Sequence, residues 1–489
     1  MNSSVRLPEP APASFFVRSA SYPWLIVGCA CFGGFMGQLD ASIVQLAMPS
    51  LETAFYAPIN AVSWVAVGYM LAIACALPIF ARLAEIAGRK SFFLSGFASF
   101  AILSTLCGFA PTLGSLVGLR ILLGIGAAMT GANSVVILVT AAGPERRGKA
   151  LGIMAATQAV GFALGPTVGG LLLGTLGWRW VFWVNVPLSL LAFVLSWMIV
   201  PKTASPVGDS RFDWLGAAFL VPALATLLVV IAQFHAWGPS PAFVACLVAA
   251  PILLAAFIWS EARTAAPLLD LRLFRSRSFS AGTIGVLLSY AMLFGMFFAM
   301  SYAFVRGYRE QPVTAGLRLT IIPVALGLVA PFAGSVSDRY SRLVLVAGPV
   351  LCGLAALTLT QTLSGAPGSL PVVMIGLAVY GVGLGLYIAS NNNETMAAAP
   401  IEKAATAGGL INLLRILGGG AGVAAAATVL AWRLDPGVGA QVRTSHTQPL
   451  TLIAAVDAIL VLLAVFAAVG TATALIRDRP NAFSVETRV

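Results

Sequence analysis

Two charged residues stand inside long apolar stretches of the sequence, where a charge could take part in chemistry. Asp40 lies well inside a run of otherwise uncharged residues, and Arg120 enters another such run. A carboxylate at the centre of a membrane costs about 2.5–3.5 kcal/mol on insertion scales, so it is expected to face a cavity or to pair. Desolvation also makes a carboxylate bind a proton more readily, which suits reversible protonation. Asp40 is therefore the main candidate for proton chemistry, the alternative being an acid near the outer end that water reaches.

Arg120 is the second candidate because arginine keeps its proton. As a fixed positive charge, Arg120 would favour the ionised form of a neighbouring acid and help to expel its proton. The alternative is an arginine at the membrane interface whose side chain extends outward to water.

Other polar residues in apolar stretches are weaker candidates for lining a cavity. They are Asn133, Gln158, Tyr290, Tyr302, Asn391 and Asn392. The two asparagines at 391 and 392 also suit a plain helix end. Arg415 is interpreted as structural.

Composition determines where these residues must lie. Of 489 residues, 59% are hydrophobic and 9% are charged, whereas a soluble domain carries about 25% charged residues. Apolar runs of about 20 residues, long enough to cross a bilayer as helices, recur along the whole chain. We expect an all-α polytopic membrane protein with about fourteen spans. Six cysteines in these spans are expected to be packed core residues rather than metal ligands.

The distribution of charge predicts the orientation in the membrane. Most of the 28 lysines and arginines fall in the terminal segments and in every second connection. The positive-inside rule then puts both termini in the cytoplasm. No nucleic-acid-binding motif accompanies the net charge of +11, so no nucleic-acid partner is expected.

Two charged connections are similar to each other. "ARLAEIAGRK" (81–90) and "GSVSDRYSRL" (334–343) each place an acid four positions after a small residue, followed by basic residues. Such loops can join helices on one face of the membrane, and their repetition indicates a moving gate. The gating residues are predicted to be Glu85, Gly88, Arg89, Lys90, Gly334, Asp338, Arg339 and Arg342.

"GFALGPTVGG" (161–170) concentrates helix-breaking residues in an apolar run. In a membrane, small residues four apart let helices approach closely, and neighbouring groups can absorb the hydrogen bond that proline loses. The residues expected to pack in this way are Gly161, Gly165, Pro166, Gly169 and Gly170.

Together these stretches resemble the major facilitator superfamily. "LDASIVQLAMPSL" (39–51), "LRILLGIGAAM" (119–129) and "GFALGPTVGG" are similar to motifs of its fourteen-span drug–proton antiporters, as are "WRWVFWVNVP" (178–187) and "PLLDLRLFRSRSF" (267–279). The first loop departs from the family pattern, with Ala81, Glu85 and Ile86 where glycine, aspartate and a basic residue are usual.

The resemblance implies two six-helix bundles with two extra helices between them. The expected division is a cytoplasmic segment 1–22, a bundle 23–200, a linker with two spans 201–280, a bundle 281–476 and a cytoplasmic tail 477–489. It implies proton-coupled export of lipophilic or cationic drugs across a bacterial inner membrane by alternating access. Asp40 and Arg120 would couple protons and substrate. No cofactor is implied beyond the proton gradient.

Alternatives remain at this stage. The same fold could export one metabolite, a siderophore or a lipid, and a non-transporting sensor is a more distant alternative. No nucleotide-binding loop, metal cluster or catalytic triad is recognisable, which argues against an enzyme. A periplasmic adaptor and an outer-membrane channel are left open as partners beside the substrate, protons and the lipid bilayer.

Overall fold

The computed structural model describes residues 7–203, 213–264, 268–400, 403–435, 437, 442–444 and 447–477. Side chains at 334–341 and 405 lie outside this description. All regular elements in the described part are helical, and fourteen helical segments there are long and apolar enough to cross a membrane. The predicted all-α polytopic fold and its fourteen spans are confirmed.

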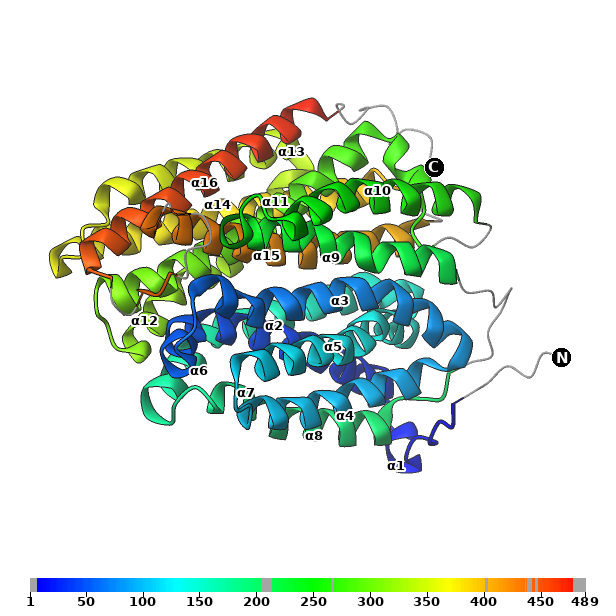
Figure 1. Cartoon of the computed structure of the whole chain (residues 1–489). Helices are drawn as coiled ribbons and strands as arrows, with labels where there is room; N and C mark the ends of the chain where they lie inside the picture. Colours follow the sequence, from blue (N-terminus) through cyan, green and yellow to red (C-terminus); the bar gives the residue numbers. More distant parts are fainter. Residues whose placement is uncertain are drawn as a thin grey trace.

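The helices of the first half of the chain form the lower layer in Figure 1. They are α1 Ser14–Val17, α2 Tyr22–Phe55, α3 Ile59–Ala87, α4 Arg89–Gly108, α5 Leu113–Ala142, α6 Arg147–Thr175, α7 Trp180–Trp183 and α8 Asn185–Ile199.

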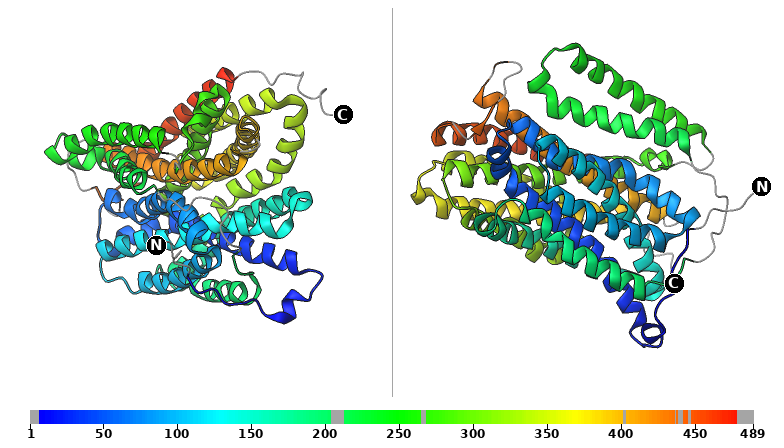
Figure 2. Two further views of the ribbon diagram at one scale, coloured as in Figure 1. Left: turned by 90° about the vertical axis from the view of Figure 1, so that its right-hand side faces the viewer. Right: turned by 60° about the horizontal axis from the view of Figure 1, so that its bottom comes forward.

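The remaining helices form the upper layer and a lateral pair, except that α12 reaches down beside α6 (Figures 1 and 2). They are α9 Trp214–Trp237, α10 Pro241–Arg263, α11 Arg277–Tyr302, α12 Pro312–Leu319, α13 Ile321–Thr362, α14 Leu370–Ala397, α15 Ala404–Leu434 and α16 Pro449–Ile476.

The two layers are the two halves of the protein, seen nearly end-on in the left panel of Figure 2. The pair α9–α10 lies beside them, with α9 against α3 and α15. We call the end of the bundle where α2 begins and α16 ends the terminal end, and the opposite end the distal end (Figure 1). The domain boundaries predicted from the sequence stay a prediction.

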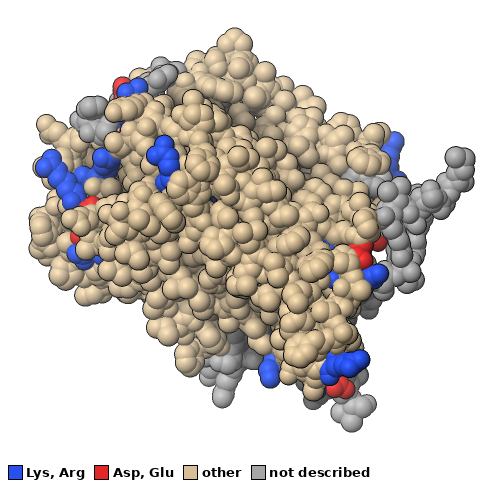
Figure 3. Space-filling view, turned by 90° about the horizontal axis from the view of Figure 1, so that it is seen from below, with Lys and Arg blue, Asp and Glu red and all other residues tan. Residues whose placement is uncertain are grey.

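On the face shown in Figure 3, the surface between these two ends carries few charged side chains. In Figure 3, lysine, arginine and acidic side chains gather mainly toward the edges of the face shown, and a broad uncharged area separates them. Large apolar side chains such as Leu106, Leu191 and Trp197 are exposed. Exposed apolar surface of this extent is stable in contact with lipid rather than water.

Local sequence explains where several spans end. Thr112 and Ser115 form a capping box at the start of α5. Gly88 separates α3 from α4 with a φ of 120°, a conformation that glycine adopts at little cost. The first charged connection is therefore a single-residue junction between two helices rather than an extended loop.

The second charged connection differs from the expectation of a loop. Residues 334–343 are helical and belong to α13, which runs without interruption from Ile321 to Thr362. A helix satisfies its own backbone hydrogen bonds whatever side chains it carries, so a charged stretch at the end of a span need not interrupt it. The chain instead breaks at Thr320, where α12 gives way to α13.

The glycines of α6 allow unusually close helix contacts. A Cβ atom at Gly161 would lie 2.6 Å from the Phe35 carbonyl oxygen, and one at Gly165 would overlap Ser42 Oγ, both on α2. A Cβ atom at Gly170 would lie 2.5 Å from the carbonyl oxygen of Pro312, on α12 in the other half. The glycine-rich face of α6 thus packs against both α2 and α12 of the second half.

Replacing Gly165 with valine should destabilise the protein by about 1–3 kcal/mol, because the larger side chain has no space against Ser42. Gly152 is the matched control on α6, since a Cβ atom there would meet nothing within 4 Å. We expect Gly165→Val to melt clearly below Gly152→Val in detergent. Equal melting temperatures would contradict this account of the α6 contact.

Candidate functional site

Asp40 and Arg120 form an ion pair in the interior of the first half. Arg120 Nη1 donates to Asp40 Oδ2 at 2.7 Å, and both side chains are 0% exposed. Asp40 lies on α2 and Arg120 on α5, so the pair joins two spans. Because the cost of desolvating two charges is repaid only by good geometry and further hydrogen bonds, the surroundings of the pair determine its stability.

Three further groups complete this cluster. Asn185, at the start of α8, donates from Nδ2 to Asp40 Oδ1 at 2.9 Å. Arg120 Nε donates to the Val65 carbonyl at 3.1 Å. The guanidinium carbon of Arg120 lies 3.9 Å from the ring centroid of Tyr69, a cation–π contact. Two further helices, α3 and α8, therefore hold the pair that joins α2 and α5.

A cavity of about 300 Å³ lies between the two halves. Gln38 and Ala41 of α2 line it, and so does Tyr69, whereas Asp40 does not. Tyr69 thus lines the cavity and also contacts the ion pair through its ring. In α6 and α15, which begin at the terminal end, the lining residues fall within 151–158 and 408–416, so the cavity occupies the terminal half of the bundle.

The sequence-based cavity residues divide into two groups. Gln158, Tyr290 and Asn392 are among the residues that line the cavity. Asn133 and Tyr302 are not among its lining residues. Asn133 donates to the Met129 carbonyl at 2.8 Å and accepts from Arg89, and Tyr302 is fully buried.

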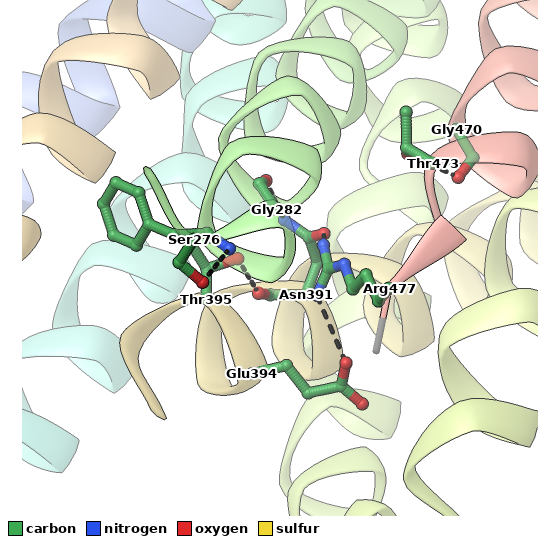
Figure 4. Close-up of polar contacts among 9 residues, drawn as sticks. Ser276, Gly282, Asn391, Glu394, Thr395, Gly470, Thr473 and Arg477 are labelled. Atoms are coloured by element: carbon green, nitrogen blue, oxygen red, sulfur yellow. Dashed lines mark hydrogen bonds and ion pairs between the residues drawn. The ribbon is translucent and has the colours of Figure 1, made fainter. Parts of the chain in front are cut away.

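Asn391 also has a structural position rather than one in the cavity. Its Nδ2 donates to the Gly282 carbonyl at 3.0 Å, and its Oδ1 accepts from Arg477 Nη2 (Figure 4). Arg477 Nη1 also lies 3.2 Å from Glu394 Oε2. Desolvation lowers the pKa of Arg477, against the opposing effect of the Glu394 carboxylate. These contacts join α11, α14 and the end of α16.

Two residues that sequence reasoning missed occupy important positions. Arg415, interpreted from the sequence as structural, lines the cavity and donates from Nη1 to Gln158 Oε1 at 3.1 Å, across the two halves. Asn185 holds Asp40. The sequence indicates a polar environment for Arg415, because a charge in an apolar span needs one. For Asn185 the sequence offers only its position in the stretch "WRWVFWVNVP".

The distal end is closed by contacts between the halves. Arg306 Nη2 donates to the Pro49 carbonyl at 2.8 Å and to Thr53 Oγ1. Thr167 and Thr320 hydroxyls lie 2.7 Å apart, joining α6 to the second half beside the Gly170 contact. Near the same end, the backbone N–H of Ile59 donates to the Val442 carbonyl at 3.0 Å.

The predicted gating residues at the terminal end make contacts within one half. Glu85 pairs with Arg82 at 2.6 Å and with Arg89 at 2.9 Å. Lys90 is 0% exposed and donates to the carbonyls of Pro10, Trp197 and Val200. Lys90 therefore anchors the N-terminal segment and α8 rather than joining the two halves.

The second predicted gating segment is only partly described. Arg342 Nη2 donates to the Leu475 carbonyl at 2.8 Å, which ties α13 to α16. The side chains of Gly334, Asp338 and Arg339 lie outside the described residues. The gating role of the two segments stays a prediction.

Comparison with known proteins identifies relatives over most of the chain. Residues 30–423 match the family described as Major Facilitator Superfamily. The multidrug resistance protein Stp of Mycobacterium tuberculosis is 32% identical over 406 residues, 82% of this chain and 74% of that protein. The riboflavin transporter RibZ of Clostridioides difficile is 28% identical over 395 residues, 81% of this chain and 85% of that protein.

A solved structure has the same fold. A bacterial homolog of the human lysosomal transporter Spinster, in an inward-facing and unoccupied conformation, matches with a TM-score of 0.68 at 14% identity. The match covers 94% of this chain and 100% of that one.

In the described part of the chain, fourteen apolar helices arranged as two halves around a cavity indicate a polytopic membrane transporter. The chain belongs to the major facilitator superfamily, and its relatives include multidrug efflux proteins. The family expected from the sequence is confirmed. The protein is a transporter and not an enzyme.

Removing Arg120 alone should destabilise the protein strongly. Arg120→Met leaves the buried Asp40 carboxylate with the Asn185 amide but no cation, and breaking a buried ion pair in this way costs about 3–5 kcal/mol. The double variant Asp40→Leu/Arg120→Met removes both charges and should recover most of the lost thermal stability in detergent. A double variant as unstable as Arg120→Met would show that the unpaired charge is not the cause.

Proposed function

We propose that this transporter exports small, largely apolar compounds in exchange for protons. The observation that carries the proposal is the buried Asp40–Arg120 pair, whose guanidinium lies against the ring of Tyr69, a residue that lines the cavity. A carboxylate in this position can respond both to a proton and to a change at the cavity wall.

The proton and Arg120 compete for Asp40. With Arg120 and Asn185 bound, the carboxylate is held as an anion by one charge and two hydrogen bonds. Protonation removes the attraction to Arg120, whose guanidinium stays charged. Because Arg120 also contacts Tyr69 and the Val65 carbonyl of α3, release of the pair lets α2, α3 and α5 change their packing.

The contacts at the two ends favour entry of the substrate from the terminal end. The distal end is closed by the Thr167–Thr320 and Arg306 contacts, and the cavity lies toward the terminal end. The excess of lysine and arginine supports a cytoplasmic location for the terminal end. We therefore infer a bacterial inner-membrane protein with both termini in the cytoplasm, in the conformation that precedes export of the substrate.

A second candidate is an exporter of one specific metabolite. The relative named as a riboflavin transporter favours it, together with the polar residues Gln38, Gln158 and Asn412 in the cavity wall. Buried polar groups discriminate strongly against ligands that leave them unpaired.

Transport can be tested in inside-out membrane vesicles with an imposed proton gradient. Two xanthene dyes of opposite charge, fluorescein and rhodamine 123, serve as probes. We expect accumulation of at least one dye in parent vesicles, its loss with an uncoupler, and its loss in Asp40→Asn. Asp457→Asn is the matched control, because Asp457 lies in a membrane span outside the cavity and the ion pair.

Each contrary result has a definite meaning. Unchanged, uncoupler-sensitive accumulation in Asp40→Asn would contradict the role of Asp40. Dye accumulation that is unchanged by the uncoupler would contradict proton coupling. No accumulation of either dye by a well-expressed parent would favour the specific-metabolite exporter.

Alternating access can be tested by linking the closed distal end. The Thr167 and Thr320 hydroxyls are 2.7 Å apart, so cysteines at both positions should form a disulfide under oxidation. We expect the oxidised double-cysteine variant to lose dye transport and to regain it on reduction, whereas the Thr167→Cys single variant should transport under both conditions. Full transport with the link formed would contradict opening at this end.

A further inference from the structure

The cavity wall carries an unbalanced positive charge. Among its described lining residues, Arg415 is the single member of the group Asp, Glu, Lys and Arg. The remaining polar lining groups are uncharged side chains such as Gln158, Asn392 and Asn412. A ligand in this cavity therefore meets a guanidinium but no carboxylate.

The position of Arg415 follows from the packing of α15. A Cβ atom at Gly418 would overlap the Leu287 carbonyl, and one at Gly422 would overlap that of Ala291, so α15 lies almost backbone-to-backbone on α11. Arg415 lies about one turn before Gly418. It lines the cavity, as do Gly408 and Ile411 earlier on the same helix.

Among the described residues, the groups in contact with this guanidinium are uncharged. Arg415 Nη1 donates to Gln158 Oε1 at 3.1 Å, and its guanidinium carbon lies 5.7 Å from the Tyr290 ring centroid. No aspartate or glutamate of the described part of the chain forms an ion pair with it. An incoming carboxylate, sulfonate or phenolate would form a charge-assisted hydrogen bond that the Gln158 amide cannot match.

Asp40 cannot favour a cationic ligand in this conformation. Its carboxylate is fully buried, does not line the cavity, and is neutralised by Arg120. The expectation of a cationic substrate depended on this acid facing the ligand. With Asp40 paired elsewhere, a cation in the cavity would meet Arg415 without compensation, and like charges repel more strongly in a partly desolvated site.

The rest of the wall suits a flat, aromatic molecule. Tyr69, Phe97, Tyr290 and Phe294 line the cavity, and aromatic rings favour stacked or edge-to-face contacts with other rings. We infer that the cavity binds small planar aromatic anions, with Arg415 as the residue that determines their charge. This inference rests on the proposed export function for its physiological meaning, but binding itself requires no gradient.

The same contact suggests how the ligand affects the two halves. Arg415 of α15 and Gln158 of α6 bridge the halves across the cavity. An anion that takes over the guanidinium replaces this bridge with contacts through the ligand. The bound anion thus joins both halves while the direct Arg415–Gln158 hydrogen bond is released.

Equilibrium binding of fluorescein and rhodamine 123 to the purified full-length protein in zwitterionic-lipid nanodiscs tests the inference. The two dyes share a flat tricyclic core and differ in charge. We expect the parent to bind fluorescein more tightly. Arg415→Gln should weaken fluorescein binding by about tenfold or more, the usual range for losing a charged hydrogen-bond partner, without weakening rhodamine 123 binding. Arg415→Lys should keep part of the preference.

Arg433→Gln is the matched control, because Arg433 is an exposed arginine near the other end of the same helix and outside the cavity. Its dye preference should equal that of the parent. The inference is overturned if the parent binds neither dye, binds both equally or prefers rhodamine 123, or if Arg415→Gln weakens both dyes alike. If fluorescein binds as expected but a proton gradient drives the accumulation of neither dye, the proposed function fails and the binding inference stands.

Discussion

The structure depends on one buried ion pair, between Asp40 and Arg120. Each charge alone would be costly at this depth, and each is acceptable only because the other lies 2.7 Å away. Asn185, the Val65 carbonyl and the Tyr69 ring fix the geometry. Such a pair is stable when both charges are present and costly when one of them is lost. Protonation of Asp40 can therefore change the preferred packing of several helices together.

The glycine contacts of α6 and α15 give the rest of the transporter its shape around this pair. Gly165 brings α6 against α2, and Gly170 brings α6 against α12 of the other half. In the second half, Gly418 and Gly422 bring α15 against α11. Close backbone contacts of this kind need few specific side chains, so helices can separate and repack without leaving many polar groups unsatisfied.

Hydropathy was sufficient to predict the spans, because the bilayer requires long apolar helices whatever their tertiary contacts. It also identified Asp40 and Arg120, since charges inside apolar runs are rare. It could not decide which way a side chain points: Asn391 and Asn392 are neighbours, yet only Asn392 lines the cavity. The helical continuity of α13 through 334–343 was hidden because polarity marks the edge of the membrane and not the end of a helix.

The most direct test of the central claim is to observe the protonation of Asp40. Infrared difference spectra of the parent in lipid, recorded on acidification, report the carbonyl stretch of a newly protonated carboxylic acid, and Asp40→Asn identifies the contribution of that residue. The account predicts a protonated-acid band that is absent from Asp40→Asn and that changes in pH dependence when a transported compound is bound. An Asp40 that stays ionised over the whole pH range in which transport occurs would contradict it.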